Sequence, residues 1–203
     1  MPALIGLLTD FGLADAYVAV MRGVILGINP QAIIVDLTHE VPPQDIRYAA
    51  YVLATAVPYF PAGTIHVVVV DPGVGSDRAL IAARAAGQVF LAPDNGVLSL
   101  VLAKGYDEVI RLTRAEYWLP NPSRTFHGRD ILAPAAGHLS RGVPLAALGE
   151  PLGREPVELP FLAPSRRADG AWVAHVIHVD RFGNLITNLR PDPESLAQLA
   201  GAH

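Results

Sequence analysis

The alternation of apolar, strand-like segments with amphipathic, helix-like segments over the first 70 residues constrains the fold most. In chain order these segments are 3–8, 14–28, 32–36, 45–59 and 64–70. The resulting β-α-β-α-β order predicts a largely parallel sheet with helices on both faces. The last segment contains four consecutive valines, Val67 to Val70, which indicates a strand covered on both sides.

The segments that follow predict a mixed sheet. Leu80–Ala85 and Gln88–Ala92 are joined around Ala86–Gly87 and are typical of a β-hairpin. Further along, the patterns predict a short helix, a strand and a second helix, at Val97–Lys104, Glu108–Leu112 and Gly128–Leu139. We therefore predict an α/β fold: a three-layer α/β/α domain with a mostly parallel mixed sheet, over residues 1–150.

A proline-rich segment predicts the end of this domain. The helical period disappears after Arg141, and prolines stand at 144, 151, 156, 160 and 164. We interpret residues 151–164 as a linker and residues 165–203 as a small, partial β-rich domain. Within the latter, 171–179 and 185–189 predict an antiparallel pair of strands, which is too small to fold on its own.

Composition excludes several classes of function. The 203 residues include no cysteine, so disulfides, thiolate catalysis and cysteine-based metal sites are excluded. A net charge of −4, with no basic run beyond Arg166–Arg167, argues against nucleic-acid binding. No apolar stretch reaches the length of a membrane span, and the N-terminal apolar run lacks a basic leader. We expect a cytoplasmic protein with a small-molecule partner and no membrane contact.

Acidic residues collect where predicted strands end. Asp10, Asp36 and Asp71 follow three successive strands, and ligands bind at this edge of open α/β sheets. After Asp71, a turn containing Gly73 and Gly75 leaves space for a ligand and leads to the permanent charge of Arg78. Each acid has an ordinary alternative, since Asp71 could begin a plain turn, and Asp10 and Asp15 could cap the following helix. Three acids at one edge favour a site, and a carboxylate there can bind ribose hydroxyls.

Two further clusters carry chemistry, each with a structural alternative. His127, in the loop at 123–130, could act as an acid, a base or a hydrogen-bond donor, or could be a plain loop histidine. Asp180–Asn184 offers an aromatic face and an amide, or is simply a β-turn.

The sequence supports neither a metal site nor a nucleotide-cofactor site. Asp10, Asp36, His39 and His127 are competent metal ligands, but their spacing matches no metal signature, so a metal-dependent hydrolase is a lesser hypothesis and no metal site is predicted. The sequence also lacks GxGxxG and Walker A motifs, so neither a dinucleotide nor a triphosphate site is supported.

Five separated motifs, taken in order, resemble one family. They are LLTDFGLADAYV at 7–18, VVVVDPGVGSDR at 67–78, APDNGVLSLV at 92–101, TFHGRDILAPAAGHL at 125–139 and VDRFGNLITNL at 179–189. The family is that of the S-adenosyl-L-methionine (SAM) hydrolases that form adenosine, also called SAM hydroxide adenosyltransferases, which are related to the SAM-dependent fluorinase and chlorinase. The resemblance covers essentially the whole chain.

The resemblance implies a reaction and a set of site residues. Water or hydroxide attacks the ribose C5′ of SAM and releases adenosine and L-methionine, with no metal and no other cofactor. The implied catalytic residues are Asp71, Arg78 and His127. The implied substrate contacts are Asp10 at the ribose, and Asp15, Tyr17, Val74, Phe126, Asp180 and Asn184 elsewhere. The resemblance also implies a homotrimer whose active sites lie at subunit interfaces.

The residues favour one version of this chemistry. A carboxylate paired with arginine is a weak base at neutral pH, so we expect the cluster to orient water rather than to remove its proton fully. Asp71 would repel a halide ion, which disfavours halogenation. Family members continue for several dozen residues past the segment that matches TNL, whereas this chain stops at His203. The alternative is therefore a protein that binds SAM or adenosine with little turnover.

Overall fold

The computed structural model describes residues 2–160 and 164–189. The chain divides into two compact units, Met1–Leu159 and Pro160–His203.

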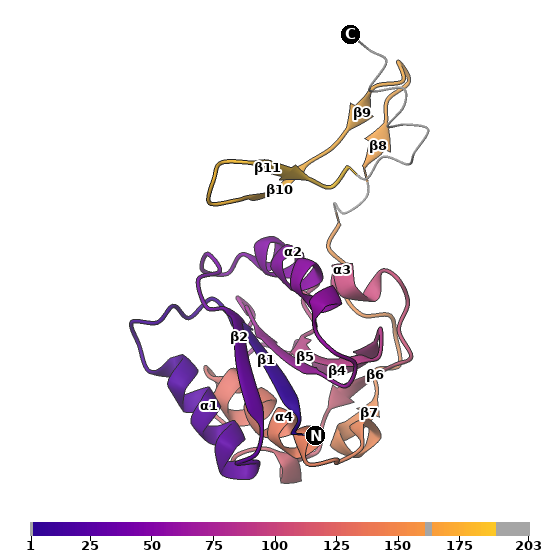
Figure 1. The fold of residues 1–203 in the computed structure, drawn as a ribbon. Coiled ribbons are helices and arrows are strands. Elements are labelled where there is room, and N and C mark those ends of the chain that lie inside the picture. Colours follow the sequence, from indigo (N-terminus) through magenta and orange to yellow (C-terminus); the bar gives the residue numbers. More distant parts are fainter. Residues whose placement is uncertain (1, 161–163, 190–203) are drawn as a thin grey trace. The chain divides into compact units, whose positions relative to one another are not determined.

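The first unit is built on a seven-stranded mixed sheet in the order β2-β1-β3-β5-β4-β6-β7 (Figure 1). Strands β2, β1, β3 and β5 are parallel, and β4, β6 and β7 each pair antiparallel with the preceding neighbour in that order. The predicted mixed, mostly parallel sheet of an α/β fold is confirmed. The strands are β1 (Leu4–Thr9), β2 (Ile33–Thr38), β3 (Ile65–Val69), β4 (Leu80–Ala85), β5 (Gln88–Pro93), β6 (Glu108–Leu112) and β7 (Gly149–Pro151).

Helices cover both faces of this sheet. Helices α1 and α4 lie together on one face, and α2 and α3 lie on the other (Figure 1). None of the helices in the described part of the chain is long and apolar enough to cross a bilayer. The α-helices are α1 (Tyr17–Ile28), α2 (Ile46–Ala56), α3 (Ser99–Leu102) and α4 (Ala133–Ser140). Short 3₁₀ turns are η1 (Val57–Tyr59), η2 (Ala115–Tyr117) and η4 (Leu145–Leu148), and η3 (Gly128–Leu132) is a π turn that leads into α4.

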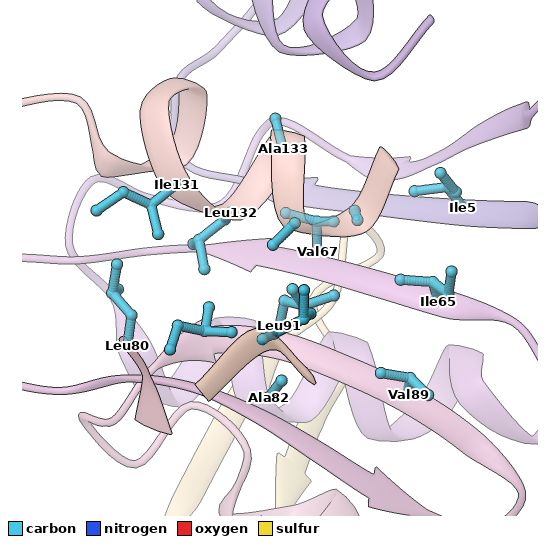
Figure 2. Close-up of a cluster of buried hydrophobic side chains, with 14 of the residues drawn as sticks. Ile5, Ile65, Val67, Leu80, Ala82, Val89, Leu91, Ile131, Leu132 and Ala133 are labelled. Atoms are coloured by element: carbon cyan, nitrogen blue, oxygen red, sulfur yellow. The ribbon is translucent and has the colours of Figure 1, made fainter. Parts of the chain in front are cut away.

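Side chains of β3 alternate between two hydrophobic cores. Val67 and Val69 point into the core under α1 and α4, where Leu132 also packs (Figure 2). Val68 and Val70 point into the core under α2. All four valines are at most 5% exposed. Because fully burying a valine contributes roughly 1.5–3 kcal/mol, this strand anchors both layers and fixes the position of the residue that follows it.

The hairpin predicted around Ala86–Gly87 is present. β4 and β5 pair antiparallel from Leu80–Pro93 to Ala85–Gln88. Ala86 and Gly87 have φ angles of 50° and 72°, and two successive positive values are typical of a type I′ turn, which matches the twist of the strands it joins.

Helix α1 begins at Tyr17, three residues later than the pattern predicted. Its N-cap is Ala16, and no side chain caps it, so neither Asp10 nor Asp15 has the capping role that the sequence left open. Helix α2, in contrast, is capped by Asp45, whose carboxylate accepts a hydrogen bond from the Tyr48 amide at 2.9 Å.

The first unit extends to Leu159 rather than to residue 150. Part of the segment predicted as a linker is held to it by the buried carboxylate of Asp94. Arg154 forms an ion pair with Asp94, and the Val157 amide donates to its Oδ1 at 2.8 Å. The Leu159 amide also donates to Ser99 Oγ at 3.0 Å. The prolines interrupt the helical pattern of the sequence, but the segment still packs against the first unit.

Over residues 164–189, the second unit contains two antiparallel pairs of strands. β8 (Ser165–Arg166) pairs with β9 (Trp172–Val173), and β10 (Val176–Val179) pairs with β11 (Leu185–Thr187). The pair predicted over 171–179 and 185–189 is therefore present, but its first strand is interrupted before Val176. At the interruption the His175 amide donates to a side chain, the Oδ1 of Asn188, at 2.8 Å. Within β10 the register with β11 shifts between Val176 and His178.

Candidate functional site

A cavity of about 320 Å³ lies at the carboxyl ends of β1 and β3. This volume falls at the lower end of the range for small-molecule sites. Residues from three strand-end loops and from the start of the π turn line it. They are Asp10, Phe11, Tyr17, Pro43, Gln44, Val69, Asp71, Val74, Thr125, Phe126, His127 and Gly128.

Asp71 and Arg78 form a fork-shaped ion pair beside this cavity. Arg78 Nε lies 2.8 Å from both Asp71 carboxylate oxygens, and its Nη2 also contacts Oδ2. The side chains are only 7% and 10% exposed, respectively. A guanidinium that meets both oxygens fixes the plane of the carboxylate and balances its charge.

The turn between these two residues depends on glycine. Gly75 has a φ of +79°, which residues other than glycine rarely adopt. A Cβ at this position would also lie 2.6 Å from the Arg124 carbonyl oxygen. The missing side chain lets this turn pack against the loop that leads to Phe126 and His127. The two parts of the cavity wall are thereby brought together.

His127 joins the ion pair through its ring. Arg78 Nη2 donates to His127 Nδ1 at 2.9 Å. Because arginine only donates, Nδ1 accepts, and the proton of the neutral ring is on Nε2. Burial and the Arg78 charge lower the pKa of His127 below the usual 6.5, although Asp71 and Asp130 act in the opposite direction. At neutral pH the histidine is therefore an uncharged donor through Nε2.

The π turn allows His127 to approach the sheet closely. Gly128, the first residue of that turn, lies against β3: a Cβ there would meet Val69 at 3.2 Å and Met21 at 3.4 Å. Single π turns inside helices frequently occur at functional sites.

Asp10 stands at the opposite part of the cavity, after β1. Its Oδ2 accepts a hydrogen bond from the Gln44 amide at 2.8 Å. Gln44 has a φ of 65°, an uncommon conformation for a residue other than glycine. The hydrogen bond to Asp10 helps to hold that conformation, so the loop after β2 is tied to the loop after β1.

Three aromatic rings form an apolar wall between these parts. Phe11, Tyr17 and Phe126 lie with ring centroids 5.3–5.6 Å apart, two of the three pairs in edge-to-face geometry. The Arg129 guanidinium lies over the Phe126 ring at 5.0 Å. Such packing holds the rings in fixed orientations around a ligand.

Most of the predicted site residues of the first unit meet here. The cavity is lined by Asp10, Tyr17, Asp71, Val74, Phe126 and His127. Arg78 does not line the cavity but binds Asp71 and His127. Asp15 is not among the residues that line it. Asp180 and Asn184 belong to the second unit, where hydrogen bonds from the Asn184 side chain and backbone lower the pKa of Asp180 and close the turn before β11.

Sequence reasoning missed several residues of the cavity wall. Pro43 and Gln44 follow β2, and their only signal was a position after a strand end. Asn95 was quoted within a motif but given no role. Its Nδ2 donates to the Val70 carbonyl at 2.9 Å, directly before Asp71, so it helps to fix the end of β3.

The metal ligands that the sequence left open are not assembled. Asp36 and His39 contact each other, whereas Asp10 binds the Gln44 amide and His127 binds Arg78. Over residues 2–160 and 164–189, no group of three or more His, Asp or Glu side chains could hold a metal ion.

The fold and this cavity define an α/β protein with a cavity at the carboxyl ends of its parallel strands, where proteins of this class bind ligands. The family model for the SAM hydroxide adenosyltransferase N-terminal domain matches residues 5–149. The chain belongs to this family.

Curated relatives and solved structures agree with that assignment. An (R)-S-adenosyl-L-methionine hydrolase of Salinispora arenicola is 44% identical over 87% of this chain and 68% of its own length. A protein of the same name from Thermus thermophilus is 41% identical over 92% of this chain and 74% of its own length. A fluorinase of Nocardia brasiliensis is 30% identical over 95% and 73%. The crystal structure of an uncharacterized conserved protein from Thermotoga maritima covers 97% of this chain and 74% of that chain, with a TM-score of 0.87 and 42% identity.

Proposed function

We propose that this chain hydrolyses SAM to adenosine and L-methionine. The observation that carries the proposal is the joining of Asp71, Arg78 and His127 beside one cavity, in a chain 39–44% identical to curated (R)-S-adenosyl-L-methionine hydrolases.

The reaction is a substitution at the ribose C5′. A bond forms between C5′ and the oxygen of water, and the bond between C5′ and the sulfonium sulfur breaks. The sulfur keeps the electron pair and leaves as neutral L-methionine, and one proton of the water is released to solvent. Because a sulfonium is already a good leaving group, the protein mainly has to position and partly desolvate one water, which contributes about 7–11 kcal/mol.

The three side chains suit that task. The Asp71 carboxylate accepts a hydrogen bond from the water and orients it, while Arg78 fixes the carboxylate plane. His127 offers its Nε2 proton to the water or to a nearby substrate oxygen. The Asp71 charge stabilises the developing positive charge on the attacking water and disfavours a halide as nucleophile.

The remaining substrate contacts are assigned by their position and by the family resemblance. Asp10, with one carboxylate oxygen bound to the Gln44 amide, presents the other to the ribose hydroxyls. Tyr17, Val74 and Phe126 surround the nucleoside with apolar side chains. Asp15, Asp180 and Asn184 contact the amino-acid part or the adenine.

The reaction as proposed requires neither a metal nor another cofactor. A cytoplasmic location also remains a prediction, which cell fractionation checks.

We further propose a homotrimer with active sites shared between subunits. Supporting evidence is the edge strand β2, on which Ile33 and Val35 are 49% and 36% exposed in the single chain. Apolar side chains on an unpaired edge favour contact with another copy. Sedimentation should give about three times the 21.6 kDa mass of the chain.

Mixing two inactive variants tests whether sites are shared. If Asp71 and Asp180 reach one site from different subunits, mixed trimers of Asp71→Asn and Asp180→Ala recover part of the activity that each variant lacks alone. No recovery from mixed trimers whose composition has been verified would contradict shared sites.

The function itself is tested by incubating the purified protein with SAM and separating the products by chromatography. Equal amounts of adenosine and methionine above a blank without protein support hydrolysis. Tight SAM binding in calorimetry, without product over hours, would instead support the binding-only alternative.

A further inference from the structure

A second group of aspartate, arginine and histidine lies outside the cavity. Arg22 of α1 forms an ion pair with Asp36 at the end of β2. His39 Nε2 lies 3.0 Å from Asp36 Oδ1, a contact that is not aligned as a hydrogen bond. His39 Nδ1 lies 2.9 Å from the Thr9 hydroxyl at the end of β1. The group therefore connects α1, β2 and β1.

This group holds the turn that carries Asp10. The Phe11 amide donates to Thr9 Oγ1 at 3.3 Å, and the Gly12 amide donates to the His39 carbonyl at 2.8 Å. Asp10 and Phe11, which both line the cavity, are thus held from two sides by residues that do not line it.

The protonation of His39 follows from its surroundings. A neutral imidazole carries one ring proton, and the Asp36 carboxylate, 3.0 Å from Nε2, stabilises that proton on Nε2. Burial, with a smaller effect of Arg22, lowers the pKa of His39 below 6.5, so the ring is neutral at pH 7. Nδ1 then accepts from the Thr9 hydroxyl, which leaves a lone pair of Thr9 for the Phe11 amide.

The same connectivity occurs in catalytic triads, where the hydroxyl is the nucleophile. Here that role is excluded by access, because Thr9 is 0% exposed and is not among the residues that line the cavity. His39 is also enclosed, at 4% exposed. The group must act on the site through the turn that it holds.

We propose that Thr9 and His39 are positioning residues that fix the Asp10–Gly12 turn, and thereby hold the Asp10 carboxylate in place to bind the sugar of the substrate. The role of Asp10 in this proposal rests on the proposed function.

The first test removes the hydroxyl alone. Thr9→Val keeps the shape of the side chain, and we expect kcat/KM for SAM to fall about 10-fold, the value of one hydrogen bond of ordinary strength. Thr113→Val is the matched control, because Thr113 Oγ1 is also buried but has no hydrogen-bond partner among the residues that the structure describes. The control should change kcat/KM less than twofold. Equal effects of the two substitutions would overturn the proposal.

Two substitutions of His39 distinguish the contributions of its two ring nitrogens. Asparagine places a polar atom near the Nδ1 position, where it can accept from Thr9, and glutamine places one near the Nε2 position. We expect His39→Asn to retain at least about threefold more activity than His39→Gln, because the contact with Thr9 carries the effect. The reverse order would contradict the proposal.

A double-variant cycle distinguishes positioning from a general loss of packing. In an Asp10→Ala background, adding Thr9→Val should cost less than about twofold, because the residue through which it acts is gone. In a Val74→Ala background the full loss of about 10-fold should remain. Equal losses in the two backgrounds would indicate a merely structural role.

Amide exchange keeps the proposal separate from the proposed function. If the wild-type protein does not hydrolyse SAM, the proposed function fails, but exchange still reports on the turn. We expect Thr9→Val to accelerate exchange at the Phe11 and Gly12 amides by about 10-fold, and Thr113→Val to leave it unchanged. Unchanged exchange in Thr9→Val would overturn the proposal whatever the activity.

Discussion

Two groups of the same three residue types lie near the carboxyl ends of parallel strands of one sheet. Asp71, Arg78 and His127 lie beside the cavity. Asp36 of β2, His39 just after that strand and Arg22 of α1 form the second group. In each group burial is the main cause that lowers the pKa of the histidine, and the arginine charge lowers it further. Both rings are therefore neutral at pH 7.

The two groups differ in the surroundings of the histidine ring nitrogens. His127 accepts from Arg78 and lines the cavity, so its protonated nitrogen is available to a ligand. His39 has both nitrogens beside protein groups, Thr9 and Asp36. Residue type therefore does not distinguish the two groups. Access to the cavity does, and it is the reason that we propose a catalytic role for the His127 group alone.

Matched substitutions of the two aspartates give the largest expected contrast. Asp71→Asn removes the charge beside the water, and we expect kcat for SAM hydrolysis to fall about 10³-fold. Asp36→Asn makes the same chemical change in a partly exposed ion pair, so kcat/KM should fall less than about fivefold. Steady-state rates of the two variants, with circular dichroism to verify folding, check this contrast. Similar losses would mean that the groups do not differ in role.

A smaller effect is expected from His127→Asn. Asparagine can still accept from Arg78, but it lacks the donor at Nε2. Because losing one donor at a reacting centre typically costs about 10²-fold, we expect a loss of that order in kcat. Single-turnover measurements separate this loss from any change in product release. Wild-type rates in this variant would remove His127 from the chemistry.

Acid should inactivate the protein through His127. Protonation places a second cation beside Arg78 and ends the hydrogen bond to Nδ1. Because the pKa of His127 is below 6.5, kcat/KM should be constant above pH 6.5 and should fall only at lower pH. His127→Asn should lack this acid limb.

The lowered histidine pKa values also affect stability. The unfolded chain binds protons more readily than the folded one, so the free energy of unfolding should decrease as pH falls below about 6.5. Denaturant titrations at several pH values measure this trend. A free energy of unfolding that rises on acidification would contradict the assigned direction.

The smallest expected effect is that of a chelator. The proposed reaction requires no metal, so extended dialysis against EDTA should change the rate less than twofold. A loss that added Mg²⁺ or Zn²⁺ restores would support the metal-dependent hypothesis instead.

The fold was largely predictable because its signals are local. The valines from Val67 to Val70 and the turn residues Ala86–Gly87 each determine the structure of their own segment, and both predictions are confirmed. The extent of the first unit was not predictable from such signals. It depends on the buried Asp94 carboxylate, which holds residues about 60 positions later in the chain.

The site was predictable where strand ends carry acids, as at Asp10 and Asp71. Gln44 was missed because it contributes through a backbone amide and a positive φ, which the residue type does not indicate. The roles of Asp36 and His39 could not be predicted from the sequence either, because a histidine near an aspartate suits a metal site and a positioning group equally well. The contact of His39 with Thr9, which the structure shows, favours the positioning group.

If water held by the Asp71 cluster attacks C5′ of SAM, as we propose, the oxygen atom of that water is incorporated into adenosine. Hydrolysis in H₂¹⁸O, followed by mass spectrometry of the products, tests this reaction. We expect one ¹⁸O atom at the 5′ oxygen of adenosine, none in methionine, and almost no labelled product from Asp71→Asn. Adenosine without the label, or labelled adenosine formed at the wild-type rate by Asp71→Asn, would contradict it.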